Sequence, residues 1–239
     1  MIKSTEKIKD LGIILAAGGS STRFSGKAGG KSKLLTIFPD IQKRMGLAEF
    51  ANMPLFMISL ISSIEICPEE NFVIVVKKED RAKFADIIAE YLPEKKPKIV
   101  VGGVTRMHSV FNGLEALSES VEFAAIHDAA RPFMTEKLFR QCINAARKHN
   151  GAVTAKRMID TVKLADKNGF IIKTIDRNLL WRVETPQIFP KDILINAYKK
   201  AFREKLEATD DAGVMEYAGY KPFLFEHTTD NRKITHPIQ

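Results

Sequence analysis

The chain has 239 residues with a net charge of +8, and 45% of its residues are hydrophobic and 28% charged. This balance is typical of a globular protein and excludes a disordered or fibrous chain. No stretch approaches the roughly 20 apolar residues of a membrane-spanning helix, and no signal-peptide pattern opens the chain. Cys67 and Cys142 are too far apart to suggest a metal site or a disulfide framework, so we expect a cytoplasmic protein.

The first predicted element is a buried strand at 13–17 that stops at Gly18-Gly19. A loop rich in glycine, serine and cations follows, including Arg23 and Lys33. Glycine lets backbone N–H groups approach an anion, and the cations supply charge. The loop predicts a phosphate site. A plain surface loop is the alternative, because neither G-x-x-x-x-G-K-S/T nor G-x-G-x-x-G is present.

Helices and strands then alternate along the chain. Apolar runs predict strands at 72–76, 99–101, 123–126 and 151–155, and helical spacing predicts helices at 54–64, 79–92, 104–117 and 135–146. The alternation predicts an α/β fold with a mostly parallel central sheet and helices on both faces.

Residues 158–176 break this alternation. Two strand-like runs flank a turn that contains Asn168-Gly169, the strongest short hairpin signal. A lone hairpin is marginal in water, so we expect it to pack on another surface, such as a second subunit. A helix from Pro190, a helix capped by Thr209 and a strand at 223–225 follow. We therefore expect one domain over 1–239 with a β-arm at about 157–177.

Three of the predicted strands end in loops rich in glycine or charge. Besides the opening loop, these are 102–109, which begins with two glycines, and 127–132, which contains His127-Asp128. The carboxyl ends of parallel strands meet at one edge of a sheet. The three loops, together with scattered basic residues and no nucleic-acid-binding signature, favour a small anionic substrate over a nucleic acid.

Several segments occur in the order and rough spacing of one enzyme family: LAAG followed by Arg23, GGVTRMHSV, HDAARP, DRNLLW, ETPQ and TDDAGVMEYAG. From about residue 12 to 235 the chain resembles the 2-C-methyl-D-erythritol 4-phosphate cytidylyltransferases. The resemblance implies a Rossmann-like nucleotidyltransferase fold and a homodimer joined through β-arms. It also implies Mg²⁺-dependent transfer of CMP from CTP to 2-C-methyl-D-erythritol 4-phosphate, which releases pyrophosphate on the non-mevalonate route to isoprenoid precursors.

Three alternatives stay open at this point. A ribitol-5-phosphate or other sugar-alcohol phosphate cytidylyltransferase shares the glycine loops and the HDA-x-RP segment. A non-catalytic nucleotide- or nucleic-acid-binding protein would also use the positive charge. The third alternative is that the chain is a fragment of a bifunctional enzyme, in which this domain is fused to the next enzyme of the pathway.

The resemblance further implies which residues form the site. Arg23 and Lys33 are the expected catalytic residues, on the CTP phosphates. The expected nucleotide-binding residues are Ala16, Ala17, Gly18, Gly19, Gly102, Gly103, Ser109, Asp128 and Ala129. The expected substrate-binding residues are Arg131, Thr161, Arg177, Thr185 and Lys233, of which Thr161 and Arg177 act across the dimer. Asp128 and Asp230 are the expected metal ligands. Arg131 has a second interpretation, as a brace for its loop.

The sequence departs from the family pattern in the first loop and in GGVTR. One extra residue lies before Arg23, so either Gly18 or Gly19 takes the family's glycine position. Lys33 is preferred to Lys31 as the loop lysine, and Val104 stands where a polar residue is common. A phosphate monoester is already an anion near neutral pH, so a Ser/His/Asp constellation is not expected.

Overall fold

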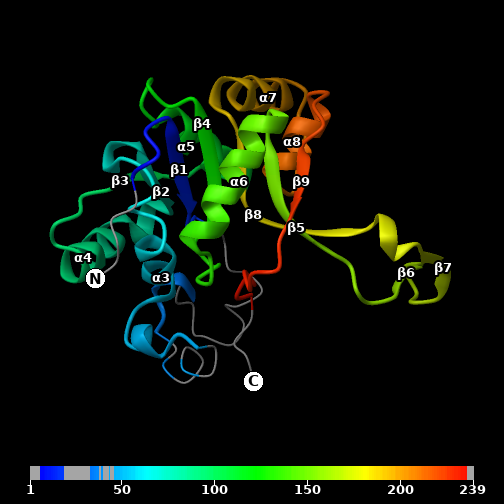
Figure 1. Cartoon of the computed structure of the whole chain (residues 1–239), viewed down its shortest axis with the longest axis horizontal. Helices are drawn as coiled ribbons and strands as arrows, with labels where there is room; N and C mark the ends of the chain where they lie inside the picture. The colour runs from blue at the N-terminus through cyan, green and yellow to red at the C-terminus, as the bar shows by residue number, and fades with distance from the viewer. Residues whose placement is uncertain (1–5, 19–32, 38, 40–42, 44–45, 236–239) are drawn as a thin grey trace.

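The computed structural model describes residues 6–18, 33–37, 39, 43 and 46–235. Its centre is a seven-stranded sheet with the strand order β3-β2-β1-β4-β8-β5-β9 (Figure 1). The strands are β1 (Leu11–Ala16), β2 (Phe72–Val76), β3 (Lys98–Val101), β4 (Phe123–Asp128), β5 (Ala152–Arg157), β8 (Trp181–Pro190) and β9 (Phe223–Glu226). All neighbouring pairs are parallel except the two that involve β8. The mostly parallel sheet is thus confirmed.

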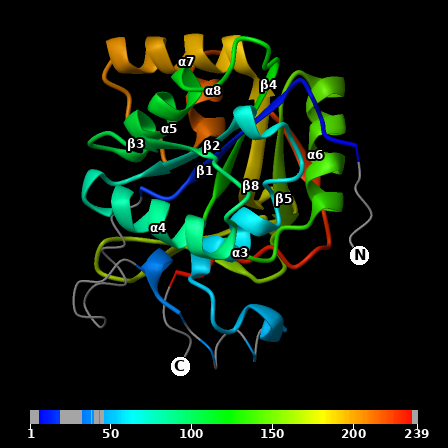
Figure 2. The ribbon, with the colours of Figure 1, turned by 90° about the vertical axis from the view of Figure 1, so that its left-hand side faces the viewer.

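Helices cover both faces of this sheet, as expected (Figure 2). They are α3 (Leu55–Ile61), α4 (Arg81–Tyr91), α5 (Arg106–Glu115), α6 (Glu136–His149), α7 (Lys191–Arg203) and α8 (Asp211–Tyr217). Side chains alternate across β1: Ile13 and Leu15 pack with α3, α4 and α6, whereas Ile14 packs with α5, α7 and α8. None of the described helices is long and apolar enough to cross a bilayer.

The strands that carry the predicted loops end level with one another. Ala16 of β1 lies beside Val75 of β2 and Asp128 of β4, and Val76 lies beside Val101 of β3. Because this part of the sheet is covered on both faces, β2 is buried along its whole length, which explains its unbroken apolar run. The loops after β1, β3 and β4 therefore leave the sheet at one edge.

Strand β8 was not expected from the sequence. It contains Pro186 and Pro190, and a proline cannot donate to a strand ladder. The strand nevertheless pairs with β4 and β5, and the pairing with β5 shifts register between Val153 and Ala155. Pro190 is the last residue of β8 and precedes α7, so the helix itself begins at Lys191.

The predicted cap of α8 was wrong by one residue. The carboxylate of Asp210, and not the hydroxyl of Thr209, accepts the backbone N–H of Gly213 at 3.0 Å. Asp210 has the extended backbone of an N-cap, with φ −150° and ψ 178°.

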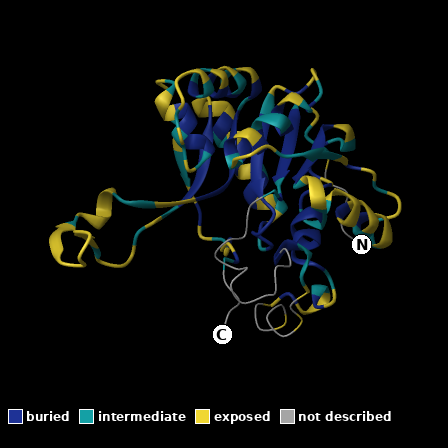
Figure 3. Cartoon of the chain, turned by 180° about the vertical axis from the view of Figure 1, so that it is seen from behind, coloured by how far each residue is buried: buried dark blue, intermediate teal, exposed yellow. Residues whose placement is uncertain are grey.

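The hairpin predicted at 158–176 is confirmed as strands β6 (Val162–Ala165) and β7 (Ile171–Ile175), which form a separate two-stranded sheet. At the turn, Asp166 Oδ1 accepts the N–H groups of Asn168 and Phe170 at 2.9 Å each. The arm projects away from the large sheet (Figure 1), and most of its residues are exposed (Figure 3). Its exposed apolar side chains include Ile159, Leu164, Phe170, Ile171, Ile172 and Leu179.

Candidate active site

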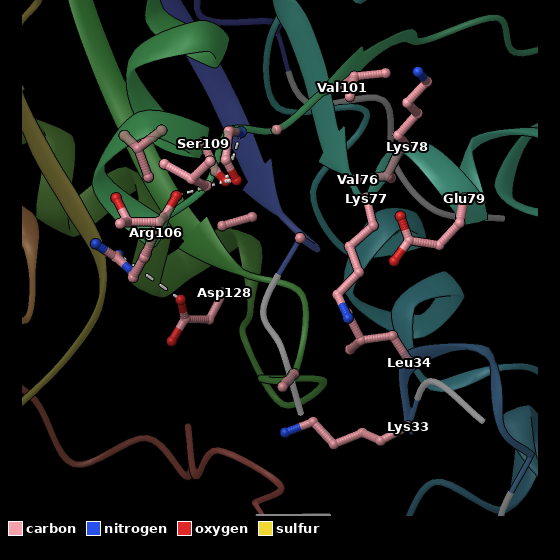
Figure 4. A pocket seen from close by; sticks show the side chains of 18 of the residues that line it. Lys33, Leu34, Val76, Lys77, Lys78, Glu79, Val101, Arg106, Ser109 and Asp128 are labelled. Atoms are coloured by element: carbon pink, nitrogen blue, oxygen red, sulfur yellow. Dashed lines mark hydrogen bonds and ion pairs between the residues drawn. The ribbon is translucent and has the colours of Figure 1, made fainter. Parts of the chain in front are cut away.

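A pocket of about 860 Å³ lies at the edge where β1, β2, β3 and β4 end (Figure 4). The described residues that line it carry five cationic and two carboxylate side chains, so the pocket is positive overall. Figure 4 shows Arg106 and Asp128 on one side and Lys33, Lys77, Lys78 and Glu79 on the other. Of the residues predicted from the sequence, the pocket brings together Ala16, Gly18, Lys33, Gly102, Gly103, Ser109, Asp128 and Lys233.

One wall of the pocket is the N-terminus of α5. Thr105 caps this helix by accepting the N–H of His108. The Ser109 hydroxyl donates to Thr105 O at 2.8 Å and accepts the N–H of Gly103 at 3.1 Å. A Cβ on Gly102 would lie 2.6 Å from Ser109 Oγ, so the close approach of loop and helix requires glycine there. The positive end of a ten-residue helix therefore faces the pocket and favours an anion.

The carboxylate of Asp128 stands at the end of β4 among three cations. Lys233 Nζ donates to Asp128 Oδ2 at 2.7 Å, while Arg106 and Arg131 each come within 3.9 Å of the carboxylate. Burial alone would raise the pKa of Asp128, but Lys233 and Arg106 lower this pKa well below its usual range. Asp128 is therefore an ionised, almost buried carboxylate at the pocket edge.

Arg106 is a pocket residue that sequence reasoning missed. Its guanidinium binds the fully buried carboxylate of Asp211 through two hydrogen bonds, of 2.7 and 3.3 Å. The hydroxyl of Tyr198, also fully buried, donates to Asp211 Oδ1 at 2.6 Å. Burial alone would lower the pKa of Arg106, but Asp211 and Asp128 raise it, so the side chain is a fixed cation. Arg106 lies in the GGVTR segment and Asp211 in the TDDAG segment. Because these segments are about a hundred residues apart, the sequence did not indicate that the two residues pair.

Lys33 is anchored to the C-terminal segment of the described chain. Its Nζ donates to the carbonyl of Ile234 at 2.8 Å. Arg131 donates to the carbonyl of Asn231 at 2.7 Å, and Asn231 Nδ2 donates to the carbonyl of Thr185 at 2.8 Å. These bonds hold the segment that carries Lys233 across the end of β4. Arg131 thus braces this segment, and it is not among the pocket-lining residues.

Other predicted residues lie away from the pocket surface. Ala17 and Ala129 are packed in the core, and Thr185 is buried behind Asp128. Thr161 is exposed just before β6, and Arg177, at the end of the arm, donates to the carbonyl of Ile159 at 2.7 Å. Asp230 is paired with Arg232 and does not line the pocket. Gly19, Arg23 and Lys31 lie outside the described residues.

Thr185 and His127 form a hydrogen-bond chain that fixes Asp128. Thr185 Oγ1 accepts the backbone N–H of Asp128 at 3.0 Å and lies 3.2 Å from His127 Nδ1. His127 Nε2 lies 3.3 Å from the carbonyl of Arg131. A carbonyl only accepts, so Nε2 carries the proton of the neutral ring and Nδ1 accepts from the threonine hydroxyl. Thr185 therefore positions Asp128.

The buried His127 predicts a pH-dependent stability. Burial lowers the pKa of His127 from 6.5 to about 4. Between these values the unfolded chain binds a proton that the folded chain does not. The neutral His127 therefore makes its full contribution to the free energy of unfolding above pH 6.5. This contribution is lost as the pH falls toward 4, which lowers the free energy of unfolding by up to about 3 kcal/mol. Chemical unfolding of the wild type and His127→Gln at pH 7 and pH 4.5 measures this. We expect the loss at pH 4.5 to be smaller in the variant; an equal loss contradicts the assignment.

The donor set at Asp128 fits a hard divalent cation that arrives with phosphates. The described residues contain no group of three or more His, Cys, Asp and Glu side chains that could hold a metal by itself. Mg²⁺ needs no such group, because it binds through one or two carboxylates and completes its shell with water and substrate phosphates. One ionised carboxylate beside a positive pocket satisfies this requirement.

Comparisons with known protein families, sequences and structures all match this chain to one enzyme family. A family model described as 2-C-methyl-D-erythritol 4-phosphate cytidylyltransferase (IspD) matches residues 43–239. The cytidylyltransferase of that name from Caldanaerobacter subterraneus is 36% identical over 188 residues, which cover 78% of this chain and 83% of the relative. The one from Dictyoglomus thermophilum is 33% identical over 229 residues, which cover 95% and 91%. The crystal structure of 4-diphosphocytidyl-2C-methyl-D-erythritol synthase from Anaerococcus prevotii superposes with a TM-score of 0.71 at 28% identity and covers 95% of this chain and 93% of that one.

The α/β sheet with its positive pocket at the carboxyl edge, together with these relatives, defines an enzyme of the nucleotidyltransferase class. The match to one family model over most of the sequence narrows the class. The chain belongs to the 2-C-methyl-D-erythritol 4-phosphate cytidylyltransferase family. The family resemblance expected from the sequence is confirmed, and a non-catalytic binding protein is not supported. The matched segment begins after Lys33, so the opening loop is not part of it.

Proposed function

We propose that the protein transfers CMP from CTP to 2-C-methyl-D-erythritol 4-phosphate and releases pyrophosphate. The observation that carries this proposal is the gathering of Lys33, Arg106, Asp128 and Lys233 around one pocket at the N-terminus of α5. Family membership supports the choice of substrates, because the relatives named above are enzymes for this alcohol phosphate.

The chemistry asks little of a protein base. The monoester phosphate of the alcohol is already anionic near neutral pH, and one of its oxygens attacks the α-phosphorus of CTP. A new P–O bond forms as the bond to the pyrophosphate leaving group breaks. The difficulty is to bring two polyanions together and to stabilise the charge that develops on the transferring group.

The pocket meets this difficulty with fixed positive charge. The N-terminal end of α5 faces the pocket beside the loop of Gly102 and Gly103, and we assign this wall to the nucleotide. Lys33 faces it from the opposite side (Figure 4), and we assign Lys33 to the CTP phosphates. Arg23 lies outside the described residues, and we keep the same role for it as a proposal. Arg106 is held at its place by buried partners, so its charge need not reorganise during the reaction.

Asp128 is the residue that we expect to hold Mg²⁺. When bound, the ion would neutralise phosphate charge and act as a Lewis acid on the transferring group. The chain prepares for this by keeping Asp128 ionised and by fixing its backbone through Thr185. We keep Asp230 as a weaker candidate, because its carboxylate is engaged by Arg232.

The substrate assignment is tested by pyrophosphate release with CTP, Mg²⁺ and a panel of alcohol phosphates. We expect release with 2-C-methyl-D-erythritol 4-phosphate at least about a hundredfold faster than with ribitol 5-phosphate. UTP and ATP in place of CTP serve as the nucleotide controls. Pyrophosphate release only with ribitol 5-phosphate, or with none of the alcohol phosphates, contradicts the proposal.

We further propose that residues 1–239 form one nucleotidyltransferase domain and that the arm joins two copies into a homodimer. An exposed two-stranded arm that carries Phe170, Ile171 and Ile172 exposes apolar surface that a second copy would bury. Thr161 and Arg177 lie on this arm, away from the pocket of their own chain, so we assign them to the alcohol phosphate in the partner's site.

The arm predicts a change of oligomeric state. Ile172→Glu is expected to convert the dimer into a monomer, because a charge buried in an apolar interface is costly. Sedimentation velocity measures this. Tyr220→Glu, at an exposed residue outside the arm, is the matched control and should stay dimeric. A dimeric Ile172→Glu protein would exclude the arm as the interface.

A further inference from the structure

The carboxylate proposed for the metal is already neutralised by the chain itself. Lys233 Nζ lies 2.7 Å from Asp128 Oδ2, on a carboxylate whose side chain is only 12% exposed. Arg106 and Arg131 approach the same carboxylate no closer than 3.9 Å. Among the described residues, Lys233 is therefore the cation in direct contact with Asp128.

We propose that the ammonium group of Lys233 is a replaceable counter-ion, which holds the position of the divalent cation at Asp128 and moves to a substrate phosphate when that cation binds. This inference rests on the proposed function, because it concerns the same pocket. It adds a role for Lys233 before the reaction: the lysine competes with the metal when no substrate is present.

Charge repulsion requires Lys233 to leave Asp128 when a divalent cation binds there. A divalent cation bound to Asp128 would lie within a few ångströms of the ammonium group, and two cations this close in a partly buried site repel each other strongly. Arg106 cannot move aside, because Asp211 holds it by two hydrogen bonds. Lys233 has no such restraint from Asp211, and its side chain is 39% exposed.

The surrounding structure allows the head group of Lys233 to move while its backbone stays in place. The backbone on either side is held, at Asn231 by Arg131 and at Ile234 by Lys33 and by the carbonyl of Ala130. The lysine stem is long and flexible, whereas the arginine fork of Arg106 is fixed. Lys233 also lines the pocket, so a phosphate there is within its reach.

The test measures Mn²⁺ binding without nucleotide, from the electron paramagnetic resonance signal of free Mn²⁺. Lys233→Met is expected to bind Mn²⁺ about five- to tenfold more tightly than the wild type, because Asp128 loses its competing cation. Lys78→Met removes the same charge from the far side of the same pocket (Figure 4) and should change the Kd less than about twofold. Lys233→Arg keeps the charge and should bind like the wild type.

The gain must also depend on Asp128. Adding Asp128→Asn to Lys233→Met should abolish the tighter binding. The inference is overturned if Lys233→Met binds Mn²⁺ no better than the wild type, if neither protein binds it measurably, or if the gain survives Asp128→Asn. Because no nucleotide is present, these outcomes do not depend on whether the protein transfers CMP. Pyrophosphate release by the wild type with an unchanged Mn²⁺ Kd in Lys233→Met would remove this inference alone.

Discussion

Asp128→Asn is expected to lower turnover about a thousandfold, the largest loss that we predict for a single substitution at the described site. The amide cannot supply the negative charge that a hard cation requires. It also leaves Lys233, Arg106 and Arg131 without the carboxylate that lies within 4 Å of each of them. Steady-state pyrophosphate release at saturating CTP and alcohol phosphate measures the effect.

Asp192→Asn is the matched control for this prediction. Asp192 is exposed in the first turn of α7, so Asp192→Asn makes the same change of charge and shape at a position outside the pocket. We expect its turnover to stay within about twofold of the wild type, as for other surface substitutions. Thermal unfolding of both variants separates a catalytic loss from a folding defect. A folded Asp128→Asn protein with more than a tenth of normal turnover would remove Asp128 from the reaction.

The second large effect concerns stability. Asp211→Ala is expected to lower the free energy of unfolding by about 3–5 kcal/mol, as when one partner of a buried ion pair is removed. The substitution leaves the guanidinium of Arg106 and the buried hydroxyl of Tyr198 without their shared acceptor. Burial, which remains in the variant, raises the pKa of Tyr198, so this hydroxyl stays protonated and cannot compensate the arginine.

The adjacent Asp210 provides a control in the same turn. Its carboxylate caps α8 through Gly213 and accepts from Gln187 Nε2 at 2.9 Å, which is ordinary capping and hydrogen bonding. We expect Asp210→Ala to cost about 1–2 kcal/mol. Urea unfolding of both variants gives the comparison. Equal losses at the two positions would show that the Arg106–Asp211 pair contributes nothing beyond the cap.

The parts of the site that lie next to one another in sequence could be predicted from it. A buried apolar run followed by glycine or by charged residues marks a strand that ends in a loop, and this pattern placed Gly18, Gly102 and Asp128 at one sheet edge. The Asn168-Gly169 turn likewise predicted the arm. Each of these signals depends on short-range backbone preferences, which a single segment carries by itself.

The parts that depend on distant partners could not be predicted. Arg106 is one arginine among many until the fold brings Asp211 against it. The resemblance predicts Thr185 as a substrate ligand, whereas its hydrogen bond to the backbone of β4 appears only when β8 is placed beside β4. The strand itself was missed because its two prolines weaken the local strand signal, whereas pairing on both sides decides its structure.

The central claim is that this pocket joins CMP to the phosphate of the alcohol. The most direct measurement is ³¹P NMR of one reaction that contains the protein, Mg²⁺, CTP and 2-C-methyl-D-erythritol 4-phosphate. The account predicts that the triphosphate and monoester signals decline together while those of pyrophosphate and of a diphosphate diester appear in equal amounts. Unchanged CTP, or pyrophosphate and CMP without the diester, would contradict it.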